Sequence, residues 1–491
     1  MAAGRWGWKL ELILSAGFGL LAGLAVPPQG QPPLLWLALA GLWAAADQAL
    51  RPFWCGALWG FAALALSHRW LLALHPLDWI GVPLPLSLPL CVALLVAIAA
   101  LAGALVGLWL RLARWLDPRR FETALLLALI WGLAELALAR GPLFWLGLGA
   151  SALPGDRPLA ALAALGSSGL VAAVQLLIGW LLWRLWRGPA RGRLAAALLG
   201  LLLGVHLLGA ALLAAQPLAG PSQRVQVLQP AIPTREKFTV VQQLRLQRQL
   251  LAALAQGRAQ GADLLVLPEG ALGLEPRLPE PAPIELISGG FRWHQGAEAL
   301  QQRSSLLRFA AAEQQPSSWL DKHRLVPLGE WVPLASWVRW SGLSAVGGLQ
   351  PGPASRLLPR PTGALAAAIC YELSDGAALA AAVRDGATWL LASANLDPYP
   401  PQLQQQFTAL AQLRAIETGR WLVSAANTGP SLLISSRGEV QAQLPLGVAG
   451  TALVTVPLLR SLTPYDRYGE LPLLLLAAAA LAWRWACRTP R

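Results

Sequence analysis

The stretch Ala366–Glu372, read AAAICYE, decides how the rest of the chain is interpreted. A run of small apolar residues ends abruptly in Cys370, Tyr371 and Glu372. This pattern predicts a buried strand that delivers one thiol to a pocket at its carboxyl edge.

Two motifs upstream place charged residues in similar settings. Glu269 follows the apolar run LLVLP, and the segment LDKHRLVPLGEWVP carries Lys322 and Glu330. Together with Cys370 they predict a Glu, Lys, Cys constellation on a water-facing domain that is held in a membrane.

The composition is that of a membrane protein with a soluble part. Of 491 residues, 56% are hydrophobic and only 13% are charged, which is too apolar for an ordinary soluble globule. The net charge of +13 comes from 38 basic and 25 acidic residues. Outside the soluble region most basic residues cluster at the ends of apolar segments, which argues against nucleic-acid binding and follows the positive-inside rule.

Eight apolar segments are expected to cross about 30 Å of hydrocarbon, although the second is marginal in length. They cover residues 10–26, 34–50, 53–74, 84–110, 121–139, 159–186, 193–215 and 471–487. Eight spans put both termini on one side, and the basic loops, such as the one with Arg119 and Arg120, assign that side to the cytoplasm. Residues 1–221 then form a membrane domain of seven spans, residues 222–467 an extracytoplasmic domain, and residues 468–491 a last span with a cytoplasmic tail.

Four polar residues fall within these spans: Asp47, Glu135, Gln175 and His206. A polar or ionisable group at membrane depth is costly and is therefore a functional candidate. Packing or hydrogen bonding between helices is the favoured alternative for each. No repeated or paired charge pattern indicates an ion path, so a transporter function has little support.

The segment from 222 to 467 alternates between strand-like and helix-like patterns, which predicts a layered α/β or α+β domain with its own core. Strands are expected at 224–229, 263–267, 364–369, 388–392, 421–425 and 432–434, and helices at 239–260, 377–383 and 404–417. The region 275–318 has weak periodicity and is expected to hold loops over the pocket as well as regular elements. Trp331, Trp337 and Trp340 belong either to a lid or lipid-facing rim, or to the core.

The residues of the constellation have complementary chemistry. A thiol becomes a nucleophile when a base removes its proton or when positive charge stabilises the thiolate. Glu269 can supply the base, and Lys322 can stabilise both the thiolate and an oxyanion. Glu330 can orient the lysine or share protons with Glu269. Cys370 is the only cysteine of the soluble region, so it has no partner there for a disulfide.

Other site chemistries have less support in the sequence. His294 and His323 are the only histidines of the soluble region and neither has a clear orienting acid. One cysteine and two distant histidines give no metal-ligand spacing, and there is no P-loop, so neither a metal nor a cofactor is expected. The chain uses arginine freely but has only three lysines, Lys9, Lys237 and Lys322, which suggests that a lysine is kept for its compact charge.

The three motifs around Glu269, Lys322 and Cys370 resemble those of the nitrilase, or carbon-nitrogen hydrolase, superfamily. With seven spans before this domain and one after it, the whole chain resembles the apolipoprotein N-acyltransferases of bacterial plasma membranes. Further matches are QPAIP from Gln229, LRAIE ending at Glu417, NTG at 427–429 and TPYDRYG from Thr463.

This resemblance implies an αββα sandwich on a polytopic helical bundle in the bacterial inner membrane, with the sandwich on the periplasmic side. It implies that Cys370 takes an acyl chain from a membrane phospholipid as a thioester. The chain then passes to the α-amino group of a diacylglyceryl-cysteine on an apolipoprotein. Glu269 would be the general base, Lys322 the oxyanion stabiliser and Glu330 a supporting carboxylate, while Tyr371 and Glu372 match positions that line the family's pocket. The chain is expected to act as a monomer.

The sequence departs from the family pattern at three places. Arg303, Ser304 and Ser305 stand where a Tyr-Asn pair is usual, the text after Asn395 is LDPYPPQ, and Phe407 replaces a histidine after Gln406. Two alternative functions therefore stay open: a membrane-tethered amidase that releases its acyl group to water, and a non-catalytic lipoprotein-binding homologue.

Overall fold

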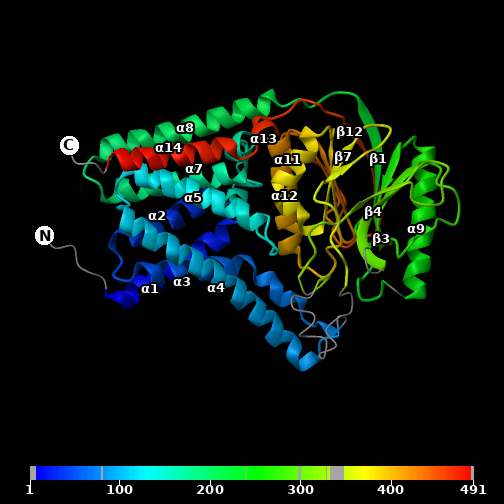
Figure 1. The fold of residues 1–491 in the computed structure, drawn as a ribbon, viewed down its shortest axis with the longest axis horizontal. Helices are drawn as coiled ribbons and strands as arrows, with labels where there is room; N and C mark the ends of the chain where they lie inside the picture. The colour runs from blue at the N-terminus through cyan, green and yellow to red at the C-terminus, as the bar shows by residue number, and fades with distance from the viewer. Residues whose placement is uncertain are drawn as a thin grey trace.

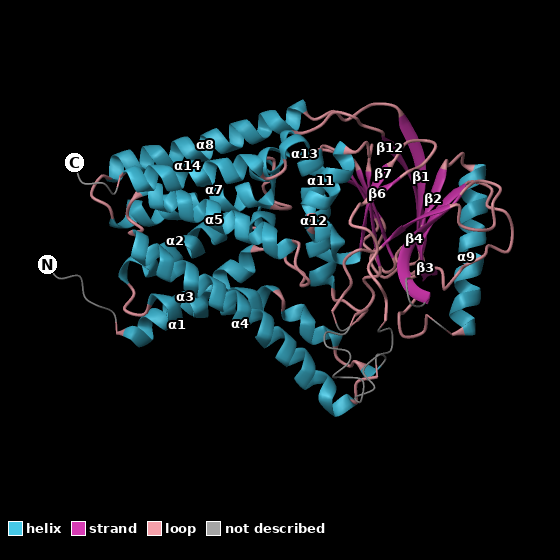
Figure 2. Cartoon of the chain, viewed as in Figure 1, coloured by secondary structure: helices cyan, strands magenta, loops and turns pink. Residues whose placement is uncertain are grey.

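The computed structural model describes residues 7–78, 81–237, 239–296, 300–327, 329–331 and 348–487. Long helices lie side by side in one half of the molecule, and two β-sheets with their own helices form the other half (Figure 1, Figure 2). Of the three tryptophans noted above, Trp331 is described and exposed, whereas Trp337 and Trp340 lie outside the described residues.

Helices occupy all eight segments that were expected to cross the membrane. They are α1 (Trp8–Ala25), α2 (Pro32–Gln48), α3 (Pro52–Ser67), α4 (Leu84–Leu116), α5 (Phe121–Ala139), α7 (Ala163–Arg187), α8 (Arg191–Ala215) and α14 (Leu471–Ala486). Within the described part of the chain, five of them, α1, α4, α5, α7 and α8, are long and apolar enough to span a membrane. The number of eight spans is therefore not confirmed by length and composition, since α2, α3 and α14 have only 17, 16 and 16 residues.

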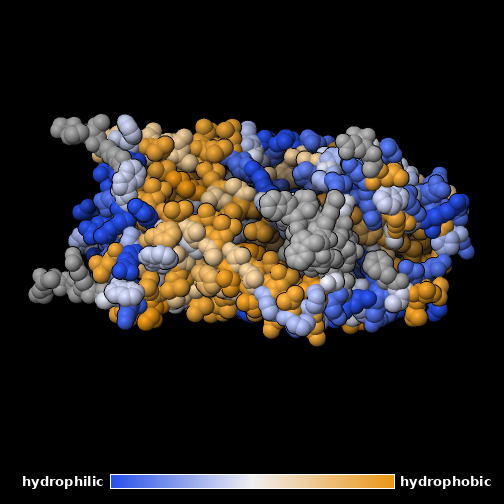
Figure 3. All heavy atoms as spheres, turned by 60° about the horizontal axis from the view of Figure 1, so that its bottom comes forward, coloured by the Kyte–Doolittle hydropathy of each residue, from blue (hydrophilic) through white to orange (hydrophobic). Residues whose placement is uncertain are grey.

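The outer surface of this bundle is apolar, as contact with lipid requires. Leu108 on α4, Leu207 on α8 and Leu475 on α14 are 58%, 70% and 60% exposed. Hydrophobic residues dominate the surface of the helical half, with hydrophilic residues gathered at its far end and over the sheet domain (Figure 3). Because so large an apolar surface is unstable in water, the bundle is a membrane domain.

Two of the expected spans are interrupted, and the sheet domain binds the backbone groups that each interruption releases. α3 ends at Ser67, and the short helix η1 (Arg69–Leu74) follows. The Ser67 carbonyl accepts hydrogen bonds from Gln402 and Gln406, each at 3.0 Å. In α7, Ser167 has φ +67°, and the N–H of the next residue donates to Glu417 at 2.9 Å.

The four polar residues within the expected spans all have partners in neighbouring segments. The contacts are Asp47 with Arg119 at 2.7 Å, Glu135 with the Leu148 N–H at 2.8 Å, Gln175 with Ser151 at 3.1 Å, and His206 with Asp156 at 3.0 Å. These contacts join α2, α5, α7 and α8 to the short connecting segments, which include η3 (Leu148–Ala152) and α6 (Arg157–Ala160). They support the interpretation that these residues pack the bundle.

Two six-stranded sheets face each other in the other half of the molecule. The first has the order β12-β1-β2-β3-β4-β5, from β1 (Ser222–Gln229), β2 (Leu264–Val266), β3 (Glu285–Gln295), β4 (Leu300–Phe309), β5 (Ser318–Asp321) and β12 (Gly450–Pro457). The second has the order β11-β10-β9-β8-β7-β6, from β6 (Leu357–Leu358), β7 (Leu365–Ile369), β8 (Leu390–Ala394), β9 (Leu422–Ala426), β10 (Leu432–Ile434) and β11 (Val440–Gln443).

Helices cover the outer face of each sheet, which gives the expected αββα layering. α9 (Val240–Ala259) lies on the first sheet, away from the membrane bundle (Figure 1). α11 (Gly376–Arg384) and α12 (Pro401–Thr418) lie on the second sheet and separate it from the bundle. The short helix α13 (Pro464–Tyr468) leads from the sheet domain back to α14.

The region of weak periodicity contains a long hairpin that the sequence did not predict. β3 and β4 pair in antiparallel register from Leu286 opposite Phe309 to Gln295 opposite Leu300. The far ends of both strands carry exposed or half-buried polar residues, and glycines interrupt the apolar alternation of β3. These features weaken the period-two pattern from which a strand is recognised.

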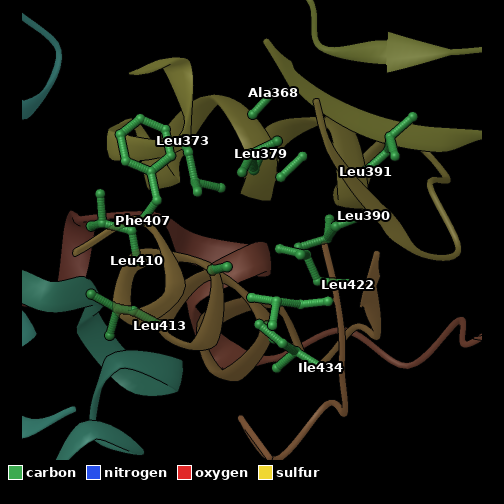
Figure 4. Close-up of a cluster of buried hydrophobic side chains, with 14 of the residues drawn as sticks. Ala368, Leu373, Leu379, Leu390, Leu391, Phe407, Leu410, Leu413, Leu422 and Ile434 are labelled. Atoms are coloured by element: carbon green, nitrogen blue, oxygen red, sulfur yellow. The ribbon is translucent and has the colours of Figure 1, made fainter. Parts of the chain in front are cut away.

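α12 is buried along most of its length because it packs against the second sheet on one side and the bundle on the other. Leu410 and Leu413 on α12 lie with Leu390, Leu422 and Ile434 in one apolar cluster (Figure 4). This helix therefore fixes the sheet domain to the membrane domain.

A close glycine contact between α5 and α7 gives a test of the packing. A Cβ on Gly132 would lie 2.3 Å from the Gly169 carbonyl oxygen, whereas a Cβ on the exposed Gly200 of α8 would meet nothing within 4 Å. We expect Gly132→Ala to lower the free energy of unfolding by about 1–3 kcal/mol, because overpacking forces the helices apart. Gly200→Ala, which makes the same change in helix propensity, should not lower it. Thermal unfolding in detergent measures both, and equal midpoints would contradict the packing.

Candidate active site

Three strand ends bring the expected catalytic residues to the sandwich rim. Glu269 follows β2, while Lys322 and Cys370 come directly after β5 and β7. β2 and β5 belong to the first sheet and β7 to the second, so the residues approach from both sheets.

Lys322 lies between two carboxylates. Its Nζ is 2.6 Å from Glu269 Oε1 and 2.8 Å from Glu330 Oε1, and its side chain has no exposed area. Glu330 is held in turn by the Val326 N–H, which donates to Oε2 at 2.9 Å. Burial alone lowers the pKa of Lys322, but the charges of Glu269 and Glu330 outweigh burial and raise that pKa well above its usual value. The lysine is therefore a permanent cation.

Cys370 sits at a strained turn. Its φ is +56°, a left-handed conformation that is costly for a residue with a side chain, and it begins the short helix η5 (Cys370–Ser374). The thiol is buried. Burial, followed by the charge of Glu269, raises the pKa of Cys370 well above its usual value, although Lys322 opposes both. The resting group is thus a thiol that needs a base to become a nucleophile.

Glu372 joins the lysine loop to the cysteine turn. Its carboxylate accepts from the backbone N–H groups of Ile369, His323 and Arg324 at 2.9, 2.7 and 3.0 Å. Arg356 Nη1 donates to both of its oxygens at 3.0 Å. Since both oxygens are occupied by donors of this chain, the observed geometry is that of a positioning residue rather than one open to a ligand.

Tyr371 is buried against the same loop. Its hydroxyl donates to the Leu325 carbonyl at 2.8 Å, and the Arg324 guanidinium lies 4.5 Å from its ring centroid. Burial raises the pKa of Tyr371 to about 12, so the phenol stays neutral. Arg324 also donates to the Gly141 carbonyl of the membrane domain at 2.6 Å, which ties this part of the site to the bundle.

Asn395, Asn427 and Thr234 also contribute to the site, and the sequence analysis did not assign them a role. The Asn395 N–H donates to Glu269 Oε2 at 3.1 Å, which fixes the oxygen that does not bind Lys322. The Asn395 side chain is held by Thr234 and Asn427, each at 3.0 Å. Both asparagines directly follow apolar strands, β8 and β9, and that position is the signal that could have identified them.

Gly289 allows β3 to pass beside the Glu269 turn. A Cβ at this position would lie 2.3 Å from Gly270 N and 2.5 Å from Glu269 Cα. Only glycine fits such a close backbone approach. The position of Glu269 therefore depends on the hairpin that the sequence analysis did not predict.

Comparisons with known proteins agree with this arrangement. The family model described as "Apolipoprotein N-acyltransferase N-terminal domain" matches residues 18–181, and the one described as "Carbon-nitrogen hydrolase" matches residues 320–462. Apolipoprotein N-acyltransferase of Prochlorococcus marinus (strain MIT 9313) is 49% identical over 492 residues, which cover 96% of this chain and 95% of that protein. The chain belongs to the apolipoprotein N-acyltransferase family.

Other members of this family are similar over comparable lengths. The protein of Parasynechococcus marenigrum (strain WH8102) is 48% identical, with 96% of this chain and 97% of that protein covered. Among solved structures, Saccharomyces cerevisiae Nit3, a member of the nitrilase superfamily, is 15% identical with a TM-score of 0.37, and the match covers 49% of this chain and 92% of that one. The match to the carbon-nitrogen hydrolase family model identifies the sheet domain as nitrilase-like.

The departure from the family pattern at residues 303–305 has a structural role in this member. Arg303 Nη1 and Ser305 Oγ donate to the carboxylate of Asp321 at 3.0 and 2.7 Å, and Arg292 binds the same carboxylate at 2.6 Å. Burial alone raises the pKa of Asp321, but these donors outweigh it and lower that pKa. Because Asp321 directly precedes Lys322, the group fixes the backbone that carries the lysine.

The described residues contain no cluster of three or more histidine, cysteine or acidic side chains that could hold a metal ion.

The protonation state of the thiol can be tested by alkylation. With its pKa raised, Cys370 should react with iodoacetamide more slowly than free cysteine at pH 8, and its rate should still be rising above pH 9. The experiment uses a Cys487→Ser background, because Cys487 is exposed while Cys55 and Cys91 are buried. Mass spectrometry of the modified peptide gives the rate, and Cys370→Ser supplies the blank. A rate that levels off below pH 8 would contradict a raised pKa.

Proposed function

We propose that this chain transfers an acyl chain from a membrane phospholipid to the α-amino group of a diacylglyceryl-cysteine on an apolipoprotein, with Cys370 as the carrier. One observation carries the proposal: a buried lysine cation is held by Glu269 at the rim where the Cys370 turn lies, in a chain whose other half is an apolar bundle. Membership of the apolipoprotein N-acyltransferase family supports the same reaction.

In the first step, Glu269 takes the proton from Cys370 and the sulfur attacks the ester carbonyl of the phospholipid. Negative charge develops on the carbonyl oxygen, and the Lys322 ammonium stabilises it. The ester bond then breaks, and the leaving alkoxide takes the proton from Glu269 to give a lysophospholipid. The products are this lysophospholipid and a thioester on Cys370.

In the second step, the amino group of the lipoprotein attacks the thioester carbonyl. Lys322 stabilises the second oxyanion, and Glu269 takes the proton that the amine loses. Collapse of the intermediate forms the amide and releases the sulfur, which recovers a proton from Glu269. Glu330 keeps the lysine in place, while Glu372 and Tyr371 position the two loops that carry the lysine and the thiol.

An apolar cavity in the membrane domain supports phospholipid as the donor. An apolar cavity of about 310 Å³ lies among α1, α3, α4 and α5, and His68 is part of its lining. The His68 ring is 6.1 Å from Phe144, and Phe144 stacks on Phe407 of α12 with ring centroids 5.6 Å apart. Phe407 and Cys370 line the same small hollow. The cavity holds an acyl chain, and the phenylalanine pair forms the passage towards the thiol.

The proposed arrangement in the membrane follows from the charges at the helix ends. All eight helices span the bacterial plasma membrane, with residues 1–221 and 468–491 as the membrane parts and residues 222–467 as the periplasmic catalytic domain. Arg119, Arg184 and Arg484 lie at the bundle end opposite the sheets, where α1 begins and α14 ends, so both termini are cytoplasmic (Figure 1). The proposed mechanism uses Glu269, Lys322 and Cys370 of one chain and calls on no second copy, so we expect the chain to act as a monomer.

Replacement of the thiol tests the carrier role. Incubated with phospholipid that carries a labelled acyl chain, the wild type should accumulate a thioester on Cys370, and Cys370→Ser should not. Addition of a diacylated lipopeptide should move the label to its amino terminus. Equal labelling of both proteins would remove Cys370 from the mechanism, whereas release of the label only as free acid would favour the amidase alternative.

Replacement of Lys322 and Glu269 tests their proposed roles as oxyanion stabiliser and general base. Lys322→Met should lower the rate of acylation roughly a hundred- to a thousandfold, because an oxyanion donor is lost. Glu269→Gln should lower it roughly a hundred- to ten-thousandfold, because the base is lost. Thermal unfolding of each variant serves as the control for folding. Near-normal rates in a folded Lys322→Met protein would show that another group stabilises the oxyanion.

A further inference from the structure

Lys237 is a second lysine beside the catalytic base, and the mechanism above gives it no role. It is one of only three lysines among 38 basic residues, and another of the three is Lys322. A chain that uses arginine almost everywhere has kept a compact ammonium group at this position.

The backbone of the Lys237 loop is fixed by contacts on both sides. The Thr234 N–H donates to Asp397 Oδ2 at 2.6 Å, and the Ile232 N–H donates to Asn427 at 3.0 Å. At the other side of the loop, Arg235 donates to the carbonyl of Pro76 in the membrane domain at 2.9 Å. The loop therefore lies between the catalytic centre and the segment that follows η1.

The ammonium of Lys237 lies against the turn that carries Glu269. A Cβ built on Gly270 would be only 2.8 Å from Lys237 Nζ. Burial lowers the pKa of Lys237, and the charges of Glu269 and Asp397 oppose that effect. The group is thus a partly buried cation, and the charges that raise its pKa are both carboxylates.

Lys237 differs from the other cations of the site in its hydrogen bonds. Lys322 donates to two carboxylates, and Arg324 donates to Ser374 and Gly141 while it stacks on Tyr371. For Lys237 Nζ, no hydrogen bond or ion pair to another described residue is present. Its three N–H donors thus have no acceptor among the described residues, and a ligand with an anionic oxygen could take them.

The proposed donor carries an anion close to the bond that reacts. In a glycerophospholipid the phosphate is attached to the same glycerol as the ester that reacts, so it lies within a few bonds of the attacked carbonyl. Glu269 and Asp397 would repel it, and a cation between them and the phosphate removes that repulsion. We propose that Lys237 binds the phosphate of the phospholipid donor and so selects phospholipid over neutral esters. This rests on the proposed function.

The test compares two donors with the same hexadecanoyl chain on the full-length protein in detergent. One is phosphatidylglycerol, and the other is 4-nitrophenyl hexadecanoate, which has no phosphate. The readout is the kcat/KM for acylation of Cys370 by phosphatidylglycerol, divided by the kcat/KM for acylation by 4-nitrophenyl hexadecanoate. For Lys237→Gln we expect this ratio to fall roughly tenfold through a higher KM for phosphatidylglycerol, because a charge-assisted hydrogen bond is lost.

Two variants serve as controls. Lys237→Arg keeps the charge and should restore most of the ratio. Arg245→Gln removes an exposed positive charge from α9 and should leave the ratio unchanged. Inorganic phosphate, at a concentration equal to that of the lipid, should not compete, since it has no acyl chain. Competition there would show a site for a free anion instead of a lipid headgroup.

Other outcomes would overturn the proposal. An equal loss of kcat/KM with both donors would mean that Lys237 acts on Glu269 or on the fold. A loss confined to transfer from a preformed thioester to the lipopeptide would mean that it serves the acceptor. If the wild type itself forms no acyl-Cys370 with either donor, the proposed function fails, and that result is distinct from a change in the ratio.

Discussion

The site depends on one buried ammonium group held between two carboxylates. Lys322 has no exposed area, and an isolated cation in such a place would be very costly, so Glu269 and Glu330 are needed to keep it there. The same contacts orient Glu269, whose second oxygen is fixed by the Asn395 N–H. In the proposed mechanism Glu269 is the base, and a base and a cation that hold each other need little rearrangement when charge develops on a substrate, which is the condition for electrostatic catalysis.

The sandwich supplies this ion pair and the thiol from different sheets, and it must keep them in register. Glu269 and Lys322 come from the first sheet, whereas Cys370 comes from the second. Glu372 connects them, because its carboxylate binds the backbone of the lysine loop and of the cysteine strand, and Arg356 neutralises it. A displacement of one sheet relative to the other would break several charge-assisted hydrogen bonds at once. The strained backbone of Cys370 is held by the same network.

The sequence predicted those parts of the fold that have a strong local pattern. The apolar strands before Cys370 and Asn395 and the helices that cover the second sheet lie within a few residues of their expected positions, and the family resemblance is confirmed. The β3–β4 hairpin was not predicted, because its glycines and polar residues conceal the alternation. The breaks at Ser67 and Ser167 were also not predicted, since hydropathy records apolar length and contains no information about the distant residues Gln406 and Glu417 that stabilise them. The role of Glu372 depends on partners far away in the chain, and no local pattern shows them.

The contacts between the sheet domain and the membrane domain explain how an enzyme domain outside the bundle can act on lipid. α12 packs on the second sheet. Its Gln406 donates to the Ser67 carbonyl at the end of α3, and its Phe407 stacks on Phe144 of the membrane domain. Arg324, next to the lysine loop, binds the Gly141 carbonyl. The thiol is thus fixed relative to the bundle by the same elements that form its pocket. In the proposed reaction, a rigid connection of this kind keeps the acyl chain in apolar surroundings while its ester reaches the sulfur, so the cost of exposing the chain to water is avoided.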